Sequence, residues 1–386
     1  MRKCILIVID SLGCGDAPDA HQYNSLGANT LSNTSKEVGG LSIPNLSSLG
    51  IGKVTEVEGV DDSNIIGSYG KLQPKSINND STTGHWELAG IISDEPFALY
   101  PEGFPIEIVN EVEKETNHKF IGNIHASGTE IIDDLGEQHL NSGDLILYTS
   151  GDSVFQIAAH ENVLPVDDLY KVCTITRSLL NKYRIGRVIA RPFIGEVGSF
   201  IRTYDRKDFG MKPPKGNLLE LLNQSKHSTI GIGKIKDLFG TEFLTKYLHS
   251  EGDEDGMKLL IEEVKQEEFD LFFINLVDCD MLYGHRENPI GYAKGLEMID
   301  EYIGELLNIC TEEDLLLITG DHGNDPTDGN TDHTREYVPI LAYNGKNICK
   351  NLGTRQSFTD VGKTICEFFN IDSKINGESF LTDITS

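Results

Sequence analysis

Six aspartate and histidine side chains lie at or shortly after the ends of short apolar segments, where they could bind metal ions. They are Asp10, Asp280, His285, Asp321, His322 and His333. Carboxylate oxygens mixed with imidazole nitrogens suit Mn²⁺, Zn²⁺ or Mg²⁺. Six ligands are more than one ion with an open coordination position needs, whereas two ions a few ångströms apart would use all of them. The set therefore indicates a two-metal centre.

Taken one at a time, these residues have ordinary explanations. A single Asp after a strand is most often a helix cap, and a single His is most often a hydrogen-bonded surface or core residue. Their joint arrangement is what favours a metal centre. Asp321 and His322 are adjacent, and His333 can return to them across a loop, while Asp280 and His285 leave a strand through a loop that contains Gly284.

A run of small hydroxyl residues, Ser81, Thr82 and Thr83, directly follows Asp80 and precedes a mixed apolar stretch. This pattern is typical of a helix N-terminus. Such a terminus offers backbone N–H groups to a phosphate, and a hydroxyl there can become a nucleophile if a metal lowers its pKa. From this segment alone, an ordinary helix cap at Asp80 or Ser81 is the simpler interpretation.

Basic residues are noticeable in the middle of a chain this acidic. They are Arg187, Arg191, Arg202, Arg206 and Lys234. Arginine forks match phosphate oxygens, although many such residues only form surface ion pairs. The segment Gly231–Lys234 is not a P-loop, because it lacks the long glycine spacing and the Ser or Thr after the lysine.

Three short apolar segments must position the acidic residues. Cys4–Ile9, Leu271–Val277 and Leu315–Thr319 are rich in Ile, Val and Phe and predict buried strands of a parallel sheet. Helical spacing in Met257–Val264 and Gly291–Asn308 predicts helices between them. Alternating strands and helices indicate an α/β fold, in which ligands bind beyond the carboxyl ends of the strands. The acidic clusters are expected at that edge.

The middle of the chain predicts an inserted α/β cap domain over residues 97–210. Turn-rich joins at 100–105 and 211–216 set it off from residues 1–96 and 211–386, which are expected to form the metal-binding catalytic core domain. The elements expected in the cap are helices at Ile106–Glu115 and Asp168–Lys182 and strands at Leu145–Thr149 and Arg187–Ala190.

Charge and composition exclude several classes of function. The formal net charge is −28, which repels nucleic acids and anionic membranes. No apolar run approaches the length needed to span a bilayer, and the first apolar stretch is too short for a signal peptide. The seven cysteines are spread out with no C-x-x-C pair, which favours reduced thiols. We expect a cytoplasmic protein without nucleic-acid or membrane partners.

These motifs closely resemble those of the phosphopentomutase family, within the alkaline phosphatase superfamily. The resemblance runs from Ile5 to near the C-terminus. It implies an alkaline-phosphatase-like core, with a central mostly parallel sheet flanked by helices, plus the inserted α/β cap domain. The matching stretches are Val8–Gly13, Gly84–Glu87, Tyr100–Pro105, Ala126–Glu130, Gly186–Phe193 and Thr319–Tyr337.

The resemblance also implies roles for single residues. One metal ion, expected to be Mn²⁺, would be held by Asp10, Asp321 and His322, and a second by Asp280, His285 and His333. The family usually has threonine directly after the Asp of its Asp-x-x-Thr-Gly-His-Trp segment. Here that position is Ser81, which becomes the expected nucleophile, with Thr82 and Thr83 as the alternatives. The residues expected to bind the sugar phosphate are Asp152, Arg187, Arg202 and Lys234.

The implied reaction is the reversible interconversion of ribose 1-phosphate and ribose 5-phosphate, and of their 2-deoxy forms, through a phosphoserine and a bisphosphate intermediate. Pentose phosphates are then the partners, and the need for a sugar bisphosphate activator stays open. A phosphatase or a cofactor-independent phosphoglycerate mutase would share the metal pattern but need a different cap. A non-catalytic sugar-phosphate-binding protein is the alternative outside enzymes, and the intact ligand set argues against it.

Overall fold

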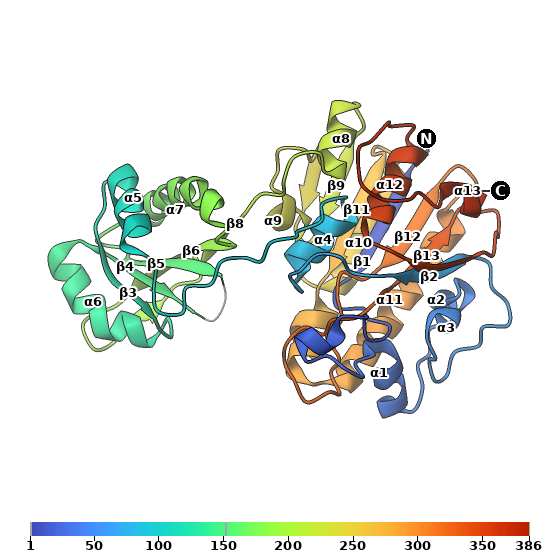
Figure 1. Ribbon diagram of the computed structural model, residues 1–386, viewed down its shortest axis with the longest axis horizontal. Helices are drawn as coiled ribbons and strands as arrows, with labels where there is room; N and C mark the ends of the chain where they lie inside the picture. Colours follow the sequence, from blue (N-terminus) through green and yellow to red (C-terminus); the bar gives the residue numbers. More distant parts are fainter. Residues whose placement is uncertain (1, 151–152, 386) are drawn as a thin grey trace. The chain divides into compact units, whose positions relative to one another are not determined.

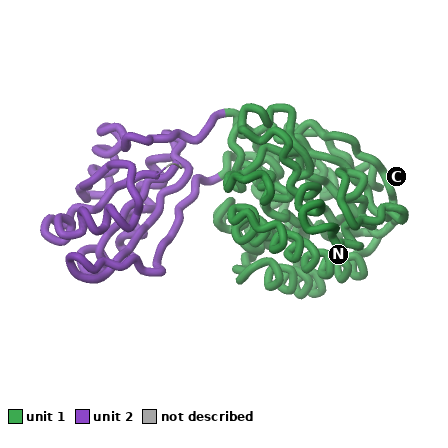
Figure 2. The backbone as a smooth tube through the Cα atoms, turned by 90° about the horizontal axis from the view of Figure 1, so that it is seen from below, with its two compact units in different colours: residues 1–94, 213–386 green, residues 95–212 purple. Residues whose placement is uncertain are grey.

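The computed structural model describes residues 2–150 and 153–385. The chain divides into two compact units, which Figure 2 shows in different colours. Unit 1 comprises Met1–Asp94 and Pro213–Ser386, and unit 2 comprises Glu95–Lys212. Unit 1 is thus built from two segments of the chain, and unit 2 is inserted between them.

The sheet of unit 1 places the three predicted strands side by side. Its order is β10-β9-β11-β1-β12-β13-β2-β14, and it is parallel from β10 to β12. The central strand is β1 (Cys4–Ile9), between β11 (Leu271–Leu276) and β12 (Leu315–Thr319), so the sequence prediction is confirmed. The other strands are β2 (Ser68–Leu72), β9 (Thr229–Ile232), β10 (Lys246–Leu248), β13 (Val338–Tyr343) and β14 (Asn351–Arg355).

Helices cover both faces of this sheet (Figure 1). On one face, α10 (Asp253–Gln266) and α11 (Pro289–Ile309) pack in a core cluster that includes Phe272 of β11. Neighbouring side chains of a strand point to opposite faces, and Phe273 contacts His85 and Phe239 on the other side. The helices on that side include α4 (Ser81–Leu88), α8 (Leu218–Gln224), α9 (Ile235–Phe239) and α12 (Thr359–Phe368). The rest are α1 (Thr30–Val38), α2 (Pro44–Ser48), α3 (Ile51–Val54) and α13 (Leu381–Thr385).

The two helices predicted in unit 1 are confirmed, and each is longer than its apolar pattern. Helix α11 begins with Pro289 at its first position, where a missing N–H costs nothing, and the Asn288 side chain accepts a hydrogen bond from the Gly291 N–H. Helix α10 begins at Asp253 with three acidic residues in its first turn, which suits the positive end of the helix dipole. These capping residues lie outside the apolar pattern, so the pattern alone underestimates the length of each helix.

Unit 2 is an α/β unit with its own sheet, in the order β3-β4-β5-β6-β7, with β8 pairing to β6. Two strand pairs are parallel, β3 with β4 and β5 with β6, while β4 and β5 are antiparallel. The elements predicted from the sequence are present as α5 (Ile106–Thr116), α7 (Val166–Leu180), β4 (Leu145–Thr149) and β6 (Arg187–Ile194). The unit also contains elements that the sequence analysis did not predict: α6 (Glu130–Ser142), β3 (Phe120–His125), β5 (Val154–His160), β7 (Ile201–Arg202) and β8 (Lys207–Gly210).

A buried glutamate joins the loops at the carboxyl edge of the unit 1 sheet. The Glu336 carboxylate accepts hydrogen bonds from the Gly15 N–H, the Thr30 N–H and hydroxyl, and the Thr334 hydroxyl. A side chain at Gly13 or Gly323 would overlap Glu336, so both segments approach it as glycine. The loop after β1, the start of α1 and the long loop after β12 are therefore held together.

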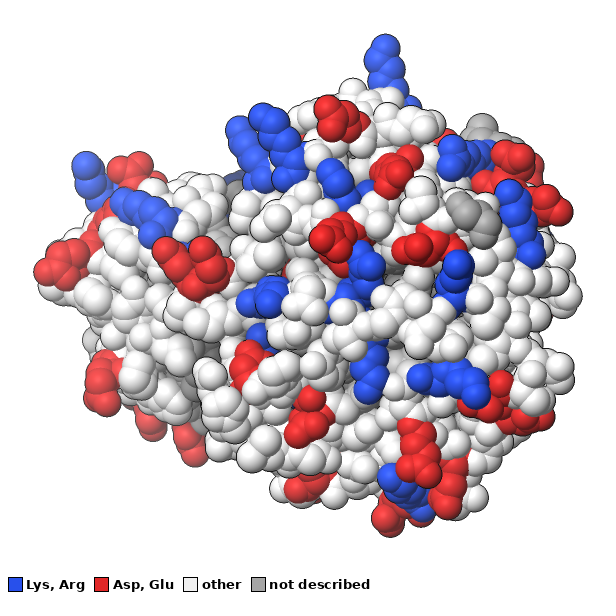
Figure 3. Space-filling view, turned by 45° about the vertical axis from the view of Figure 1, so that its right-hand side comes forward, with Lys and Arg blue, Asp and Glu red and all other residues white. Residues whose placement is uncertain are grey.

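The face of the protein drawn in Figure 3 carries charges of both signs. Figure 3 shows basic and acidic side chains interspersed over one face, so the excess of acid is not gathered into a single patch there. Within residues 2–150 and 153–385, no helix is both long and apolar enough to cross a membrane.

A buried aspartate at the start of α10 makes stability depend on pH. Asp253 and Asp278 exchange hydrogen bonds, each backbone N–H donating to the other carboxylate. Asp253 is 1% exposed, and burial, followed by the nearby Asp278 charge, raises its pKa from 3.8 to about 7. The folded chain therefore keeps a proton that the unfolded chain releases near pH 4. The free energy of unfolding should fall as pH rises from about 4 to about 7.

We expect Asp253→Asn to stabilise the protein at pH 8, because the amide stays neutral and its oxygen can still accept the Asp278 N–H. The gain should be at most about 4 kcal/mol, since one pKa unit corresponds to about 1.4 kcal/mol. Urea unfolding of metal-free protein between pH 5 and pH 8 measures it. The exposed Glu254→Gln on the same helical turn is the control, with little change expected. A variant less stable than the original chain at pH 8 would contradict the assignment.

Candidate active site

The three neighbouring strands deliver three aspartates to one edge of the sheet. Asp10 directly follows β1, and its backbone N–H donates to the Leu276 carbonyl at the end of β11. Asp321 follows β12 after one glycine. Asp280 lies in a single π-helical turn, Cys279–Tyr283, where the sequence suggested an irregular loop. All three carboxylates are buried, which matches the expected edge of an α/β fold.

The first cluster of possible ligands joins two of these strand ends. One atom each of Asp10, Asp321 and His322 lies within 4.8 Å of the others, and all three residues are buried. His322 Nε2 is 3.4 Å from Asp10 Oδ1 and 3.6 Å from Asp321 Oδ2. This is the trio that the family resemblance implied for one ion.

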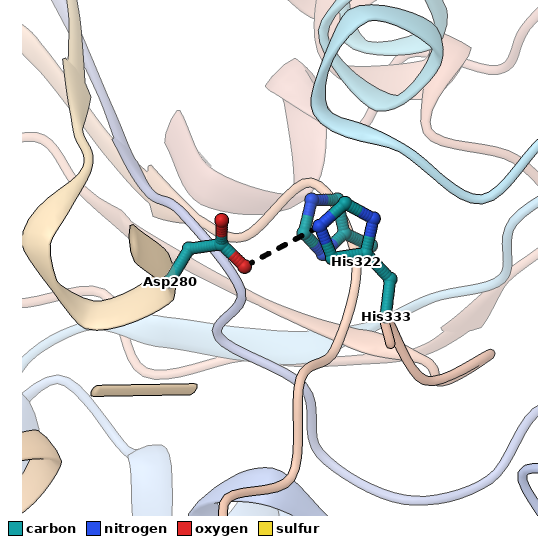
Figure 4. A group of neighbouring side chains, drawn as sticks. All are labelled: Asp280, His322 and His333. Carbon is teal, nitrogen blue, oxygen red and sulfur yellow. Dashed lines mark ion pairs between the residues drawn. The ribbon is translucent and has the colours of Figure 1, made fainter. Parts of the chain in front are cut away.

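The second cluster lies beside the first and shares a residue with it. Ligand atoms of Asp280, His322 and His333 also lie within 4.8 Å of one another. Figure 4 shows the His322 and His333 rings overlapping on the side of the Asp280 carboxylate, with ring centres 3.9 Å apart. His285 belongs here too, because its Nε2 is 3.2 Å from Asp280 Oδ2 and 3.1 Å from His333 Nε2. All six predicted ligands therefore lie together, with His322 between the two groups.

The orientation of the histidine rings tests whether these residues fit metal ions. The Nδ1 atoms of His285, His322 and His333 each face a backbone carbonyl, at Thr331, Gly323 and Asn79 respectively. A carbonyl only accepts, so each Nδ1 carries a proton. Each Nε2 faces the carboxylates, where it can give a lone pair to a cation or, without one, hold a second proton and donate it in a hydrogen bond to a carboxylate. Lone pairs and carboxylates so close repel one another unless cations lie between them. A carbonyl partner on the outer nitrogen is also the usual support of a metal-bound histidine.

The pKa values of the three carboxyl groups depend on burial and on the charges around them. Burial, followed by the charges of the nearby Asp321 and Asp280 carboxylates, raises the pKa of Asp10 to about 6. Burial also opposes ionisation of Asp280 and Asp321. There, hydrogen bonds from His285 and His333 to Asp280, and the charges of His322 and His85 near Asp321, outweigh burial and hold both pKa values below their ordinary range. The donor set fits divalent cations in both clusters.

A serine hydroxyl faces the clusters from the start of α4. The Asp80 carboxylate caps this helix by accepting the Thr83 N–H at 3.0 Å, as the sequence suggested. The Thr83 hydroxyl donates to the same carboxylate. Ser81 Oγ instead lies 3.2 Å from His322 Nε2 and 3.3 Å from Asp10 Oδ1. Of the residues in this hydroxyl run, Ser81 is thus the one with contacts to the first cluster.

The C-terminal end of α4 is anchored independently of the clusters. The buried Glu87 carboxylate accepts the backbone N–H groups of Lys75, Ser76 and Phe358 and the hydroxyl of Ser357. The Trp86 indole N–H donates to the Leu238 carbonyl. These contacts fix the position of α4 on the sheet, and hence the position of Ser81, its first residue.

Sequence reasoning missed three polar residues that support the predicted ligands. The Asn275 amide donates to Asp10 Oδ2 at 3.1 Å, and the Asn324 amide donates to Asp280 Oδ1 at 2.9 Å. His85 Nδ1 lies 3.1 Å from Asp321 Oδ2. A local signal was available for each of the three: Asn275 is a polar residue in the apolar run of β11, and Asn324 follows Asp321-His322-Gly323. His85 adjoins a glycine and a tryptophan in a matched motif.

The predicted phosphate-binding residues fall in both units. Lys234 immediately precedes α9 in unit 1, close enough for its positive charge to oppose, in small part, the rise in the pKa of Asp10. Arg187 and Arg202 lie on β6 and β7 of unit 2, and Asp152 lies outside the described residues. Unit 2 contains a pocket of about 270 Å³ that includes three arginines. It is lined by Ala126, Ser127, Gly128, Tyr148, Ser150, Val154, Gln156, Arg187, Ile189, Arg191 and Arg206.

Comparison with known proteins places this arrangement in a family. A family model described as the metalloenzyme superfamily matches residues 2–373. A curated protein named phosphopentomutase from Dictyoglomus thermophilum is 49% identical, covering 100% of this chain and 99% of its own. Another of that name, from Clostridium novyi, is 48% identical with the same coverage. The solved PH0037 protein of Pyrococcus horikoshii, 16% identical, shares the fold over 97% of this chain and 99% of its own, with a TM-score of 0.51. The chain therefore belongs to the phosphopentomutase family of isomerase enzymes, within the metalloenzyme superfamily.

Proposed function

We propose that this protein reversibly interconverts ribose 1-phosphate and ribose 5-phosphate, and the 2-deoxy forms, by way of a phosphorylated Ser81. The observation that carries the proposal is the Ser81 hydroxyl, at the capped start of α4, within 3.3 Å of both Asp10 and His322. A phosphoryl group on that oxygen would lie beside six metal-ligand side chains. The full-length identity to proteins named phosphopentomutase supports the choice of substrate.

Two divalent ions, Mn²⁺ in our proposal, would be held by the two clusters. Asp10 and Asp321 serve the first ion and Asp280, His285 and His333 serve the second, while His322 lies between them. When bound, the ions supply charge stabilisation for the transferring phosphoryl oxygens and lower the pKa of the attacking hydroxyl. The carbonyl-bound histidines keep their Nε2 lone pairs directed inward before any ion arrives.

The proposed reaction moves one phosphoryl group at a time between Ser81 and the sugar. Phospho-Ser81 gives its phosphoryl group to the free hydroxyl of a bound pentose monophosphate, which forms a pentose bisphosphate and frees the serine hydroxyl. The bisphosphate turns, and its other phosphate returns to Ser81. The product is the isomeric monophosphate and the enzyme is again phosphorylated. An added sugar bisphosphate would serve as the activator if the serine loses its phosphate to water.

Basic side chains distinguish a mutase from a phosphatase, because only the mutase must hold a sugar phosphate by either end. We propose that residues 97–210 act as a cap domain, and that its Arg187 and Arg202, with Asp152, bind the sugar phosphate. Lys234 contributes from the core domain. The three arginines around the pocket of unit 2 support a phosphate-binding role for that unit.

The nucleophile is tested by Ser81→Ala. We expect turnover of ribose 1-phosphate with added Mn²⁺ to fall by several orders of magnitude while the circular dichroism spectrum is unchanged. Peptide mass spectrometry of the active enzyme should place the phosphate on Ser81. Thr82→Ala is the matched control and should keep most activity. A phosphopeptide modified at Thr82 or Thr83 would overturn the assignment.

Removing one histidine should remove one metal ion. His333→Ala removes one of the proposed ligands of the ion that Asp280 binds. We therefore expect metal content to fall from about two ions per chain toward one, and activity to be lost. Atomic emission after gel filtration in Mn²⁺ measures the content. His227→Ala, which removes a histidine next to Asp270 before β9, is the control. Full metal content and full activity in His333→Ala would show the two-ion proposal to be wrong.

Binding of the sugar phosphate group that is not being transferred is tested by Arg202→Ala. The loss of one charge-assisted contact should cost about 1.5–3 kcal/mol, or roughly ten- to a hundredfold in transfer to pentose phosphate. Hydrolysis of phospho-Ser81 should stay the same or rise. The enzyme is loaded with labelled phosphate, and the measurement is how much of the label is released to water and how much is transferred to ribose 5-phosphate. Lys182→Ala, which removes an exposed cation of unit 2 paired with Glu111, is the control. Equal loss of both routes would mean that Arg202 supports the fold rather than the substrate.

A further inference from the structure

His85 is a fully buried histidine one helical turn after Ser81, and no step proposed so far uses it. Its exposure is 0%, and its ring stacks against Phe273 of β11, with ring centres 6.0 Å apart. Neighbouring Gly84 brings α4 into direct contact with the loop after β12, because a side chain there would overlap the Asp321 backbone. His85 thus lies where the helix of the nucleophile meets a metal-ligand loop.

One ring nitrogen of His85 faces both parts of the site. Nδ1 lies 2.8 Å from the Ser81 carbonyl oxygen and 3.1 Å from Asp321 Oδ2. The carbonyl only accepts, so Nδ1 carries a proton and donates it to Ser81, while the contact with Asp321 is electrostatic. Asp321 Oδ1 accepts the Ser11 N–H at 3.1 Å, whereas Oδ2 has no hydrogen-bond partner among the described residues. The Nδ1–H group of His85 therefore lies beside that second oxygen, closer than His322 Nε2 at 3.6 Å.

The other ring nitrogen carries no polar contact that could explain the histidine. Nε2 is buried and has no hydrogen-bond partner within residues 2–150 and 153–385. A ring needed only to fill space against Phe273 would be less costly as an apolar side chain, because an unpaired buried nitrogen destabilises the fold. The polar role of His85 therefore rests on Nδ1, and this makes it testable with side chains that imitate one nitrogen or the other.

We propose that His85 is a positioning residue that ties the nucleophile to the first metal cluster. Through Nδ1 it holds the Ser81 backbone and the Asp321 carboxylate in one fixed relation, so that the serine oxygen and the ligand oxygen keep their spacing. The role rests on the proposed function of Ser81. Mutation of a residue that contacts a metal ligand in this way typically lowers metal affinity or activity ten- to a hundredfold.

The test compares His85→Asn with His85→Gln. The asparagine amide can occupy the place of Nδ1, and the longer glutamine places its amide near Nε2 instead. Both are polar and similar in size. Isothermal titration of the metal-free protein with Mn²⁺ is the first readout. We expect His85→Gln to weaken one of the two binding events ten- to a hundredfold and to leave the other unchanged, whereas His85→Asn stays within about threefold of the original chain.

Activity and phosphorylation give the second readout. We expect kcat to fall in His85→Gln while KM for ribose 5-phosphate stays the same, because Nδ1 faces the nucleophile rather than the sugar. The phosphorylated fraction of Ser81 should fall with kcat, and His85→Asn should recover both. His139→Gln, at a buried histidine of unit 2 bound to Asp144 and His160, is the control for losing a buried ring.

The outcomes separate this proposal from the proposed function. If the original chain does not turn over ribose 1-phosphate, the reaction proposal fails, while the Mn²⁺ titration still tests His85. If both variants weaken both binding events equally, or if His85→Gln binds Mn²⁺ as the original chain does, the positioning role is overturned. If His85→Gln does not fold, His85→Leu takes its place, with the same expected loss at one binding event and the same recovery in His85→Asn.

Discussion

Three carboxylates that end or follow neighbouring strands, Asp10, Asp280 and Asp321, are removed from water within one small region. Each would be costly there alone, because burial disfavours the charged form and the three repel one another. The raised pKa of Asp10 expresses this cost, and the Nε2 atoms of three histidines face the same carboxylates. The need to compensate it with cations explains why the clusters, the serine and their supporting amides occur together.

The compensation also explains the place of His322. It belongs to both clusters and contacts Ser81, so a displacement of its ring would disturb both groups at once. Its Nδ1 is bound to the carbonyl of the next residue, Gly323, and its ring stacks with His333. A short local contact therefore fixes a residue on which the larger arrangement depends. The glycines around it give the backbone room to turn beside Glu336.

The sequence predicted what depends on local pattern. The apolar runs that became β1, β11 and β12, and the spacing of α10 and α11, were sufficient because buried parallel strands and helices have distinct periods. Asp10, Asp280 and Asp321 could be proposed as ligands because each closely follows such a run, whereas His333 was proposed from a loop that could bring it back to Asp321 and His322. Asn275, Asn324 and His85 were not found because their partners lie 44 to 265 residues away, and only the packed fold brings them within reach. The antiparallel strand β13 and the helical turn that carries Asp280 had no strong local signal either.

The central strand of the unit 1 sheet, β1, is synthesised first, but both of its neighbouring strands are synthesised much later. β1 pairs on one side with β11, which begins at Leu271, and on the other with β12, which begins at Leu315. The chain between β1 and β11 includes the whole of unit 2. On a ribosome adding about 5–20 residues per second, β1 would wait roughly 15–60 s for its second neighbour. During that time unit 2, whose segment is continuous, can fold by itself. A six-residue apolar strand with two open edges would meanwhile be exposed to other chains, so the insertion of unit 2 lengthens the time in which the nascent chain can aggregate.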